Sequence, residues 1–355
     1  MQLIETFCDL GITAIANLQT TFLDGEKFFL PISRAGDPDY AFSVIFPLLA
    51  IISTKLSSEV LAVSLVAEWL NTLLKWILME HRPYWWVKER ELLVEHAYPV
   101  LQQTRLSCET GPGSPSGHVM GSTAVLFAIV ASLDEILSKS RKISHRTKAA
   151  GKYILWILFG ASLILIAMSR LYTATHFPHQ CFLGFLGGLY VAKSLLLDTK
   201  MSTWWRNSKR PKVLLAALGM TMISFGAYWL QKGLGIDPQW SVKLAFKWCS
   251  KPDWIHVNTT PLFSLVRDCG AAFGIALISP VSMRYTSLGT SSCIVKGVLI
   301  GGVMVAMHLA QAAIPIGHVL TFYLCQFMLY AVQPYIYLVI VPFLATQQKV
   351  TNKSD

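Results

Sequence analysis

Nine apolar stretches, long enough to cross a bilayer, constrain the fold of this chain more than any other feature. A helix needs roughly 20 apolar residues to span the hydrocarbon core. The composition agrees, because 53% of the residues are hydrophobic and 14% are charged, which excludes an ordinary water-soluble globule of this length. The sequence therefore predicts an all-α, polytopic membrane helix bundle with nine transmembrane helices, at residues 39–56, 59–79, 119–137, 153–168, 181–197, 213–231, 262–281, 294–313 and 319–346.

The basic residues in the loops indicate which ends of these spans face the cytosol. Lys and Arg are retained on the cytosolic side, and the loops on the side of the carboxyl terminus carry the larger share, for example at 139–152 and 200–212. We therefore expect a non-cytosolic amino-terminal segment at 1–38, a transmembrane domain at 39–346 and a cytosolic tail at 347–355. The net charge of +10 follows from this topology, and no nucleic-acid binding is expected.

Three short motifs fall on the non-cytosolic side when the spans are counted in this way: KWILMEHRP at 75–83, PSGH at 115–118 and SRLYTATH at 169–176. They combine Lys and Arg, which bind phosphate oxygens, with a hydroxyl and two imidazoles. Cys, His and carboxylate residues with the spacing of a metal site do not occur. The motifs together predict a phosphate-transfer site that uses no metal and no other cofactor.

The first motif continues a row of polar residues inside a predicted span. Glu68, Asn71, Lys75 and Arg82 recur at spacings of 3, 4 and 7, which places them on one face of a helix. Charged residues inside a membrane are costly and usually face a cavity or a partner. An ion pair between Glu68 and Lys75 that joins helices is the structural alternative, and the nearby Arg82 and Pro83 favour a phosphate site instead.

The other two motifs place polar residues at helix ends. In PSGH, the free amides of a helix start, the Ser116 hydroxyl and the close approach allowed by Gly117 would suit a phosphate oxygen. A simple helix cap explains both residues equally well but gives His118 no purpose. In SRLYTATH, the fork of Arg170 can bind two phosphate oxygens, and His176, which can attack phosphorus, follows six positions later. A core histidine is the alternative for His176 alone.

The pattern K-x6-RP, PSGH, SR-x5-H resembles the type-2 phosphatidic acid phosphatase and vanadium haloperoxidase superfamily. More narrowly, KWILMEHRPYWW, CETGPGSPSGH, SRLYTATHFPHQ and KWCSKPDWIHVNTTP are similar to the catalytic subunits of glucose-6-phosphatase, from about Gly36 to Arg267. The resemblance implies a type-2 phosphatidic acid phosphatase-like helical core. It also implies hydrolysis of glucose 6-phosphate on the lumenal face of the endoplasmic reticulum membrane, in glucose production or sugar-phosphate clearance, with functional coupling to a glucose-6-phosphate transporter.

The resemblance also implies roles for single residues. His176 is the expected nucleophile that forms a phosphohistidine, and His118 is the expected acid, which protonates the departing sugar oxygen and then activates water. The remaining motif residues would hold the phosphate oxygens: Lys75, Arg82, Ser116, Gly117 and Arg170.

One position departs from the wider superfamily. The lipid-phosphate branch has Asp four residues after the nucleophilic histidine, where this chain has Gln180. A neutral amide can orient the imidazole but cannot raise its basicity, so another carboxylate or a backbone carbonyl is expected to do so. The nearest alternative function is a lipid-phosphate phosphatase with the same histidine mechanism. A transporter or a catalytically weak binding protein is the alternative of another class.

Two further features lie on the predicted lumenal side. Asp37, the tryptophan pair at 85–86 and the segment 254–260 could hold sugar hydroxyls, although the tryptophans suit an interfacial belt equally well. Asp37 also resembles a family position near the site. Cys108 and Cys249 share this side, where a disulfide or two free thiols are both compatible with the sequence.

Overall fold

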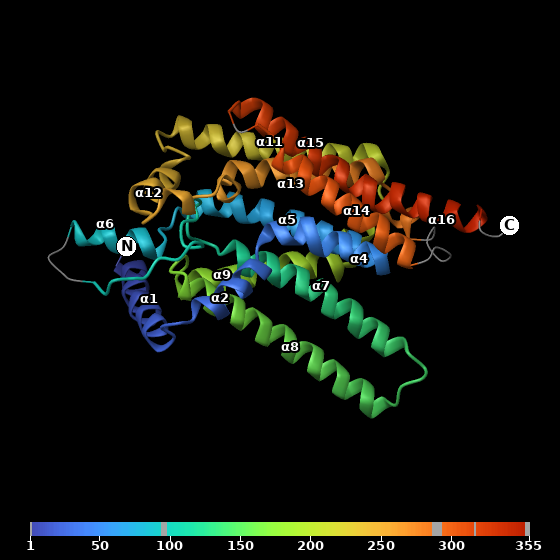
Figure 1. Cartoon of the computed structure of the whole chain (residues 1–355), viewed down its shortest axis with the longest axis horizontal. Helices are drawn as coiled ribbons and strands as arrows, with labels where there is room; N and C mark the ends of the chain where they lie inside the picture. The colour runs from blue at the N-terminus through green and yellow to red at the C-terminus, as the bar shows by residue number, and fades with distance from the viewer. Residues whose placement is uncertain (1, 94–97, 286–292, 316, 352–355) are drawn as a thin grey trace. The chain divides into compact units, whose positions relative to one another are not determined.

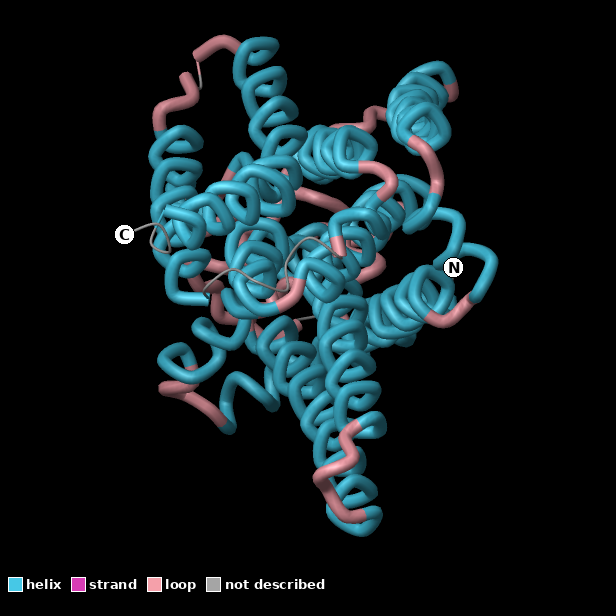
Figure 2. The backbone as a smooth tube through the Cα atoms, turned by 90° about the vertical axis from the view of Figure 1, so that its right-hand side faces the viewer, coloured by secondary structure: helices cyan, strands magenta, loops and turns pink. Residues whose placement is uncertain are grey.

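The structure is a computed structural model that describes residues 2–93, 98–285, 293–315 and 317–351. Within these ranges the chain consists of helices and loops, and no β-strand occurs (Figure 2). The all-α prediction is confirmed. The α-helices are α1 (Gln2–Thr21), α2 (Glu26–Ala35), α3 (Pro38–Tyr40), α4 (Phe46–Ile52), α5 (Thr54–Leu78), α6 (Pro83–Glu91), α7 (Gly117–Lys139), α8 (His145–Tyr172), α9 (Pro178–Leu196), α10 (Thr199–Asn207), α11 (Arg210–Gly233), α12 (Trp240–Trp248), α13 (Pro261–Ile278), α14 (Cys293–Ala312), α15 (Val319–Tyr335) and α16 (Val341–Thr351). Shorter 3-10 or π-helical turns are η1 (Ala41–Ile45), η2 (Pro252–Trp254), η3 (Val257–Thr259), η4 (Val281–Arg284) and η6 (Ile336–Ile340).

Seven helices of the described chain are long and apolar enough to cross a membrane, and the count reaches nine if each of two bent pairs is one span. The bent pairs correspond to the first and fifth predicted spans: Glu26–Ala35 with Pro38–Ile52, bent by 50°, and Pro178–Leu196 with Thr199–Asn207, bent by 68°. The first bend precedes Pro38, because proline disfavours a helical conformation in the residue before it. Each of the nine predicted stretches is therefore largely helical, with a break at Ser53 in the first and non-helical residues at 279–280 in the seventh.

The helices form two compact units, each built from three stretches of the chain. One unit consists of Met1–Pro38, Leu70–Leu189 and Gly226–Ser264. The other consists of Asp39–Trp69, Tyr190–Phe225 and Leu265–Asp355. All three motifs belong to the first unit. The division into an amino-terminal segment, a transmembrane domain and a tail stays a prediction, and 352–355 of that tail lie outside the described residues.

In the first unit, α7 and α8 lie side by side as a helical hairpin (Figure 1), and α1 and α2 pack against α8. An apolar core joins one face of α1 to Trp85 and Trp86 of α6 and to Phe177. This core fixes the two segments that carry Arg82 and His176. Because Trp85 and Trp86 are buried in it, the prediction that they hold sugar or form an interfacial belt is wrong.

Two glycines let α9 approach α7 at the level of their backbones. A Cβ added at Gly184 or Gly188 would lie 2.6 Å or less from a backbone carbonyl oxygen of α7. The first turn of α7 carries His118, and α9 begins directly after the loop that carries His176. The contact therefore holds the two imidazole-bearing segments at a fixed separation.

In the second unit, Arg267 of α13 is buried among carboxylates. Its guanidinium lies 2.5 Å from Asp39, 2.8 Å from Asp268 and 3.8 Å from Glu68. Opposite charges inside a membrane protein usually pair in this way. Glu68 therefore belongs to an ion cluster centred on Arg267.

Candidate active site

A tight turn between α8 and α9 brings the ends of the third motif together. The carbonyl oxygen of Arg170 accepts hydrogen bonds from the amides of Thr175, at 3.1 Å, and His176, at 3.4 Å. The Thr175 hydroxyl donates to the same oxygen at 2.9 Å. Ala174 adopts a φ of 54°, which is uncommon for a residue other than glycine and allows the chain to turn back. Arg170 and His176 thus reach the same side of the turn.

Arg82 lies outside the helix that carries Lys75. Helix α5 ends at Leu78, and Arg82 is extended directly before Pro83, with φ −98° and ψ 151°, because proline disfavours a helical conformation there. The predicted common helix face of Lys75 and Arg82 is therefore wrong. Carbonyl oxygens hold the Arg82 guanidinium instead, those of Gly111 at 2.6 Å, Pro112 at 3.3 Å and Thr175 at 3.3 Å.

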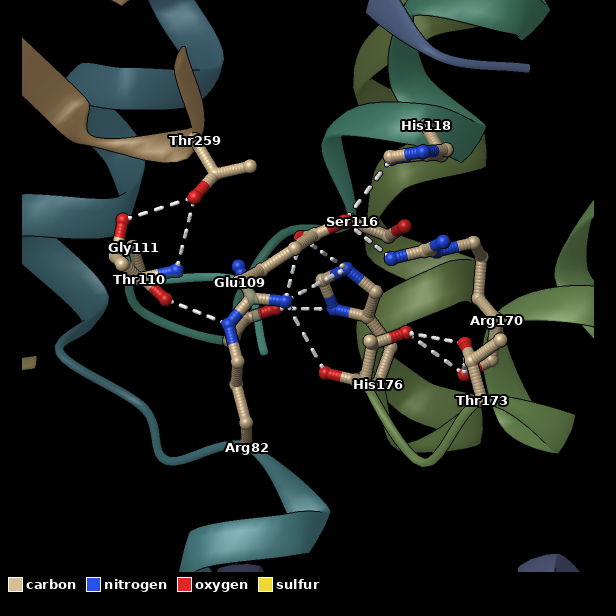
Figure 3. Close-up of polar contacts among 12 residues, drawn as sticks. Arg82, Glu109, Thr110, Gly111, Ser116, His118, Arg170, Thr173, His176 and Thr259 are labelled. Atoms are coloured by element: carbon tan, nitrogen blue, oxygen red, sulfur yellow. Dashed lines mark hydrogen bonds and ion pairs between the residues drawn. The ribbon is translucent and has the colours of Figure 1, made fainter. Parts of the chain in front are cut away.

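Side chains from all three motifs converge on the carboxylate of Glu109 (Figure 3). Arg82 Nη1 lies 2.7 Å from Oε2, and Arg170 Nη2 donates to Oε1. His118 Nδ1 lies 3.6 Å from Oε1, and His176 Nε2 lies 3.8 Å from Oε2. Both guanidinium groups and His176 are almost fully buried. The predicted meeting of the three motifs is therefore found, and it forms a site for an anion.

The hydrogen bonds of His176 define its tautomer. Nδ1 lies 2.8 Å from the carbonyl oxygen of Gly113, which can only accept, so Nδ1 carries the hydrogen. Nε2, 3.3 Å from Arg82 Nη1, therefore holds the lone pair. Burial and the positive charge of Arg82 lower the pKa of His176 well below 6.5. Burial acts to raise the pKa of Glu109, but the charges of Arg170 and Arg82 outweigh it and hold that pKa well below 4.5.

Gln180 supports the loops around this ring. Its Nε2 donates to Glu80 Oε2 at 3.0 Å and to the carbonyl oxygen of His81 at 2.9 Å. Its Oε1 accepts from the amide of Phe177 at 3.1 Å. The expected backbone carbonyl partner of the imidazole is supplied by Gly113, so Gln180 acts on the loop geometry around the ring.

Ser116 and Gly117 begin α7. Ser116 is the N-cap, and its hydroxyl accepts from the amide of Val119. The Ser116 amide donates to the carbonyl oxygen of Gln180 at 3.0 Å, and Asn71 Nδ2 donates to that of Pro115 at 3.1 Å. These contacts fix the start of α7, and a contact of Ser116 or Gly117 with phosphate stays a prediction.

Lys75 approaches the same loop from α5. It is half-buried, and its Cδ lies 3.8 Å from the position that a Cβ would take at Gly111. The carbonyl oxygen of Gly111 accepts from Arg82. The structure therefore brings Lys75 beside the segment that holds Arg82.

A small cavity that is open to solvent lies beside Glu109. His118 and Arg170 line it together with Asp37 and residues of the segment 254–259. Polar and aromatic side chains of this kind can orient a small polar ligand. The predicted sugar-side residues Asp37 and 254–260 therefore lie next to the anion site.

Sequence reasoning missed several residues of this site. Glu109 lies in the quoted stretch CETGPGSPSGH, where an acidic residue two positions before Gly-Pro-Gly was the available signal. Gly113 acts through its backbone, which leaves no signal in the sequence. Arg34 and Arg105 also line the cavity, and Ser33 accepts from Arg170 Nη1.

A disulfide joins Cys108 and Cys249, with 5.7 Å between the Cα atoms. The structure thus contains the first of the two alternatives that the sequence allowed. Gln103 reinforces the connection, because its Nε2 donates to the carbonyl oxygen of Trp248 at 3.0 Å and its Oε1 accepts from the amide of Ser250 at 2.8 Å. The chain directly before Glu109 is therefore anchored.

Comparison with known proteins identifies the family of this chain. Residues 57–204 match the family model for the PAP2 superfamily. Glucose-6-phosphatase catalytic subunit 1 of Felis catus is 33% identical over 94% of each chain. Glucose-6-phosphatase 2 of Homo sapiens is 38% identical over 75% of this chain and 74% of its own. No solved structure matches the chain. The chain therefore belongs to the glucose-6-phosphatase family, within the PAP2 superfamily.

Proposed function

We propose that this protein hydrolyses glucose 6-phosphate to glucose and inorganic phosphate through a phosphohistidine on His176. One observation carries the proposal: two guanidinium groups and two imidazoles surround a single anion position. The family supports the substrate, because relatives that span most of this chain bear the name glucose-6-phosphatase.

In the first step, His176 Nε2 attacks phosphorus and the bond from phosphorus to the sugar oxygen breaks. His118 gives its proton to that oxygen, so glucose leaves as the neutral alcohol. The Nδ1–H of His176 keeps its hydrogen bond to the Gly113 carbonyl, which stabilises the positive charge that develops on the ring.

In the second step, His118, now neutral, takes a proton from water, and the resulting hydroxide attacks phosphorus. The bond from phosphorus to His176 breaks, and inorganic phosphate leaves. Arg82 and Arg170 bind the equatorial oxygens in both steps, since charge spreads over these oxygens as the phosphoryl group transfers. Lys75 adds positive charge nearby, and the start of α7 at Ser116 and Gly117 offers backbone amides.

The cavity lining favours a sugar over a lipid as the leaving group. Asp37 and Asn258 line it, and their carboxylate and amide groups form hydrogen bonds with hydroxyl groups rather than with acyl chains. A phosphate-release assay that compares glucose 6-phosphate, other sugar phosphates and phosphatidic acid tests this choice. Preference for phosphatidic acid would establish the lipid-phosphate phosphatase, and substrate transport without phosphate release would establish the transporter.

Two further measurements test the chemistry. His176→Ala should lose both the trapped phosphohistidine and turnover, and retained activity would exclude the nucleophile. EDTA should leave activity unchanged, because the proposed groups around the phosphate are Arg, Lys and His. Within the described residues no group of three or more His, Cys, Asp or Glu side chains could hold a metal ion.

We place the site on the lumenal face of the endoplasmic reticulum membrane, with the carboxyl terminus in the cytosol. The distribution of basic residues among the loops supports this orientation. Substrate would then depend on a separate glucose-6-phosphate transporter. Activity in sealed microsomes should therefore rise when the membrane is permeabilised. Equal activity before and after permeabilisation would contradict a lumenal site whose substrate supply is limited by transport.

A further inference from the structure

The carboxylate of Glu109 occupies the position that the proposed function assigns to the phosphoryl group. Arg82 and Arg170 contact its two oxygens, one each, and His118 and His176 approach the same oxygens at 3.6 and 3.8 Å. The side chain of Glu109 is 13% exposed. It therefore fills the centre of the anion site (Figure 3).

A phosphate ester and this carboxylate cannot share the site. Both are anions, and two like charges in one site repel strongly where burial excludes water. Arg82 Nη1 and Arg170 Nη2, the nitrogens that face the site, are already engaged by Glu109. Entry of a phosphoryl group therefore requires that the carboxylate leave.

The backbone of Glu109 is held by contacts separate from those of its carboxylate, so the side chain can be displaced without moving the chain. Its carbonyl oxygen accepts from the Tyr84 hydroxyl at 3.0 Å, and the neighbouring Cys108 is disulfide-bonded. Arg34 and Arg105 line the adjoining cavity and are exposed, so the displaced carboxylate has cationic partners there.

We propose that Glu109 is a resident counter-anion that occupies the phosphoryl site when it is empty and competes with every phosphate that enters. The inference rests on the proposed function and extends it to product release. A sugar phosphate offsets the competition with contacts in the cavity, whereas inorganic phosphate has no sugar to make them. Glu109 thereby weakens the retention of product.

The rival role for Glu109 is a clamp that holds the two arginines in place. The two roles predict opposite effects of Glu109→Gln. Removal of a competitor tightens phosphate binding, whereas removal of a clamp lets the arginines separate and weakens it. The sign of the change therefore decides between them.

The test is equilibrium binding of radiolabelled orthophosphate to the purified full-length protein at pH 7. Glu109→Gln should lower the phosphate Kd about tenfold. This is the change in Kd expected when phosphate no longer has to displace one charge-assisted hydrogen bond. An unchanged or higher Kd would overturn the inference. Glu89→Gln is the matched control, because it removes a carboxylate of the same unit that accepts from Lys247 at 2.8 Å, and its Kd should equal that of the wild type.

A second variant guards against misfolding of the first. Glu109→Asp keeps the charge but is one methylene shorter, so its carboxylate cannot reach both arginines, and phosphate should again bind more tightly than to the wild type. A Kd equal to or above the wild-type value would refute the competition.

The outcome is separable from the proposed function. A wild-type protein that binds orthophosphate but cleaves no phosphate ester refutes the proposed function, and the comparison of Kd values still judges Glu109. Active wild-type protein with no tightening in either variant refutes only the role of Glu109. If neither the wild type nor either variant binds orthophosphate, the role of Glu109 is refuted, and phosphate release from glucose 6-phosphate still judges the proposed function.

Discussion

A single methyl group added at Gly113 tests the orientation of His176, the proposed nucleophile, most directly. The carbonyl oxygen of Gly113 lies 2.8 Å from His176 Nδ1, and its amide donates to the carbonyl oxygen of Glu80 at 2.7 Å. A Cβ at this position would lie 2.4 Å from the carbonyl oxygen of His81 and 2.7 Å from Gln180 Nε2. Ordinary contact begins at 3.4 Å, so Gly113→Ala requires the backbone to move by about 1 Å.

A movement of this size removes the hydrogen bond that fixes the ring of His176. The distance from Nδ1 to oxygen would exceed the range in which such a bond forms. Misplacement of a reacting group by about 1 Å costs on the order of 100-fold in rate. We therefore expect Gly113→Ala to lower kcat about 100-fold while KM changes by less than about threefold, because the cavity side chains stay in place.

The assay is phosphate release from glucose 6-phosphate by purified protein, with thermal unfolding as a check that the variant is folded. Gly111→Ala is the matched control in the same loop, because its Cβ would meet neighbours at 3.6 Å or more, which is ordinary contact. It should keep the wild-type kcat. A folded Gly113→Ala protein with wild-type kcat, or an equal loss in Gly111→Ala, would refute the role of the carbonyl.

Three further predictions concern stability. In the unfolded chain, the imidazole of His176 takes up a proton below about pH 6.5, whereas in the folded protein its pKa lies well below that value. The free energy of unfolding should therefore fall as the pH drops below 6.5. The melting temperature should then change less between pH 7.5 and 5.5 in His176→Asn than in the wild type, and an equal change would contradict a buried neutral ring. Cys249→Ser should lower the free energy of unfolding by about 2–4 kcal/mol. A wild-type melting temperature that is the same with and without a reducing agent would argue against the disulfide to Cys108. Gln180→Glu would place a second carboxylate near Glu80, now 3.0 Å from the amide, and should lower the melting temperature. Glu80→Gln in the same chain should restore part of the loss, and no rescue would refute the repulsion.

The spans could be predicted from sequence because a bilayer leaves an apolar stretch of this length little choice but to form a helix. The windows at 213–231 and 294–313 agree with α11 and α14. The bends could not be predicted, because they depend on single residues that a hydropathy window averages out. Pro38 follows one break, and Asp198 caps the helix after the other, where its carboxylate accepts from the Met201 amide at 2.7 Å.

The motif residues could be predicted because charged and imidazole side chains in an apolar chain need a reason to be there. The role of Glu109 could not be predicted, because its partner Arg170 lies 61 positions away in the sequence. Only the fold shows that the two side chains are in contact. The prediction that Arg82 shares a helix with Lys75 was wrong because it assumed that the helix continues up to Pro83, whereas α5 ends at Leu78. Gly113 contributes a backbone oxygen, which every residue type possesses.

The cavity draws its walls from separate stretches of the chain. The side chains of Arg82, His118 and Arg170, which surround Glu109, belong to the ends of α7 and α8 and to the residue before α6. Trp254 and Asn258 belong to the segment between α12 and α13. Exchange of that segment would alter which alcohol fits without touching the bonds that hold His176. Paralogues could therefore diverge in the sugar they accept while inheriting one reaction centre unchanged.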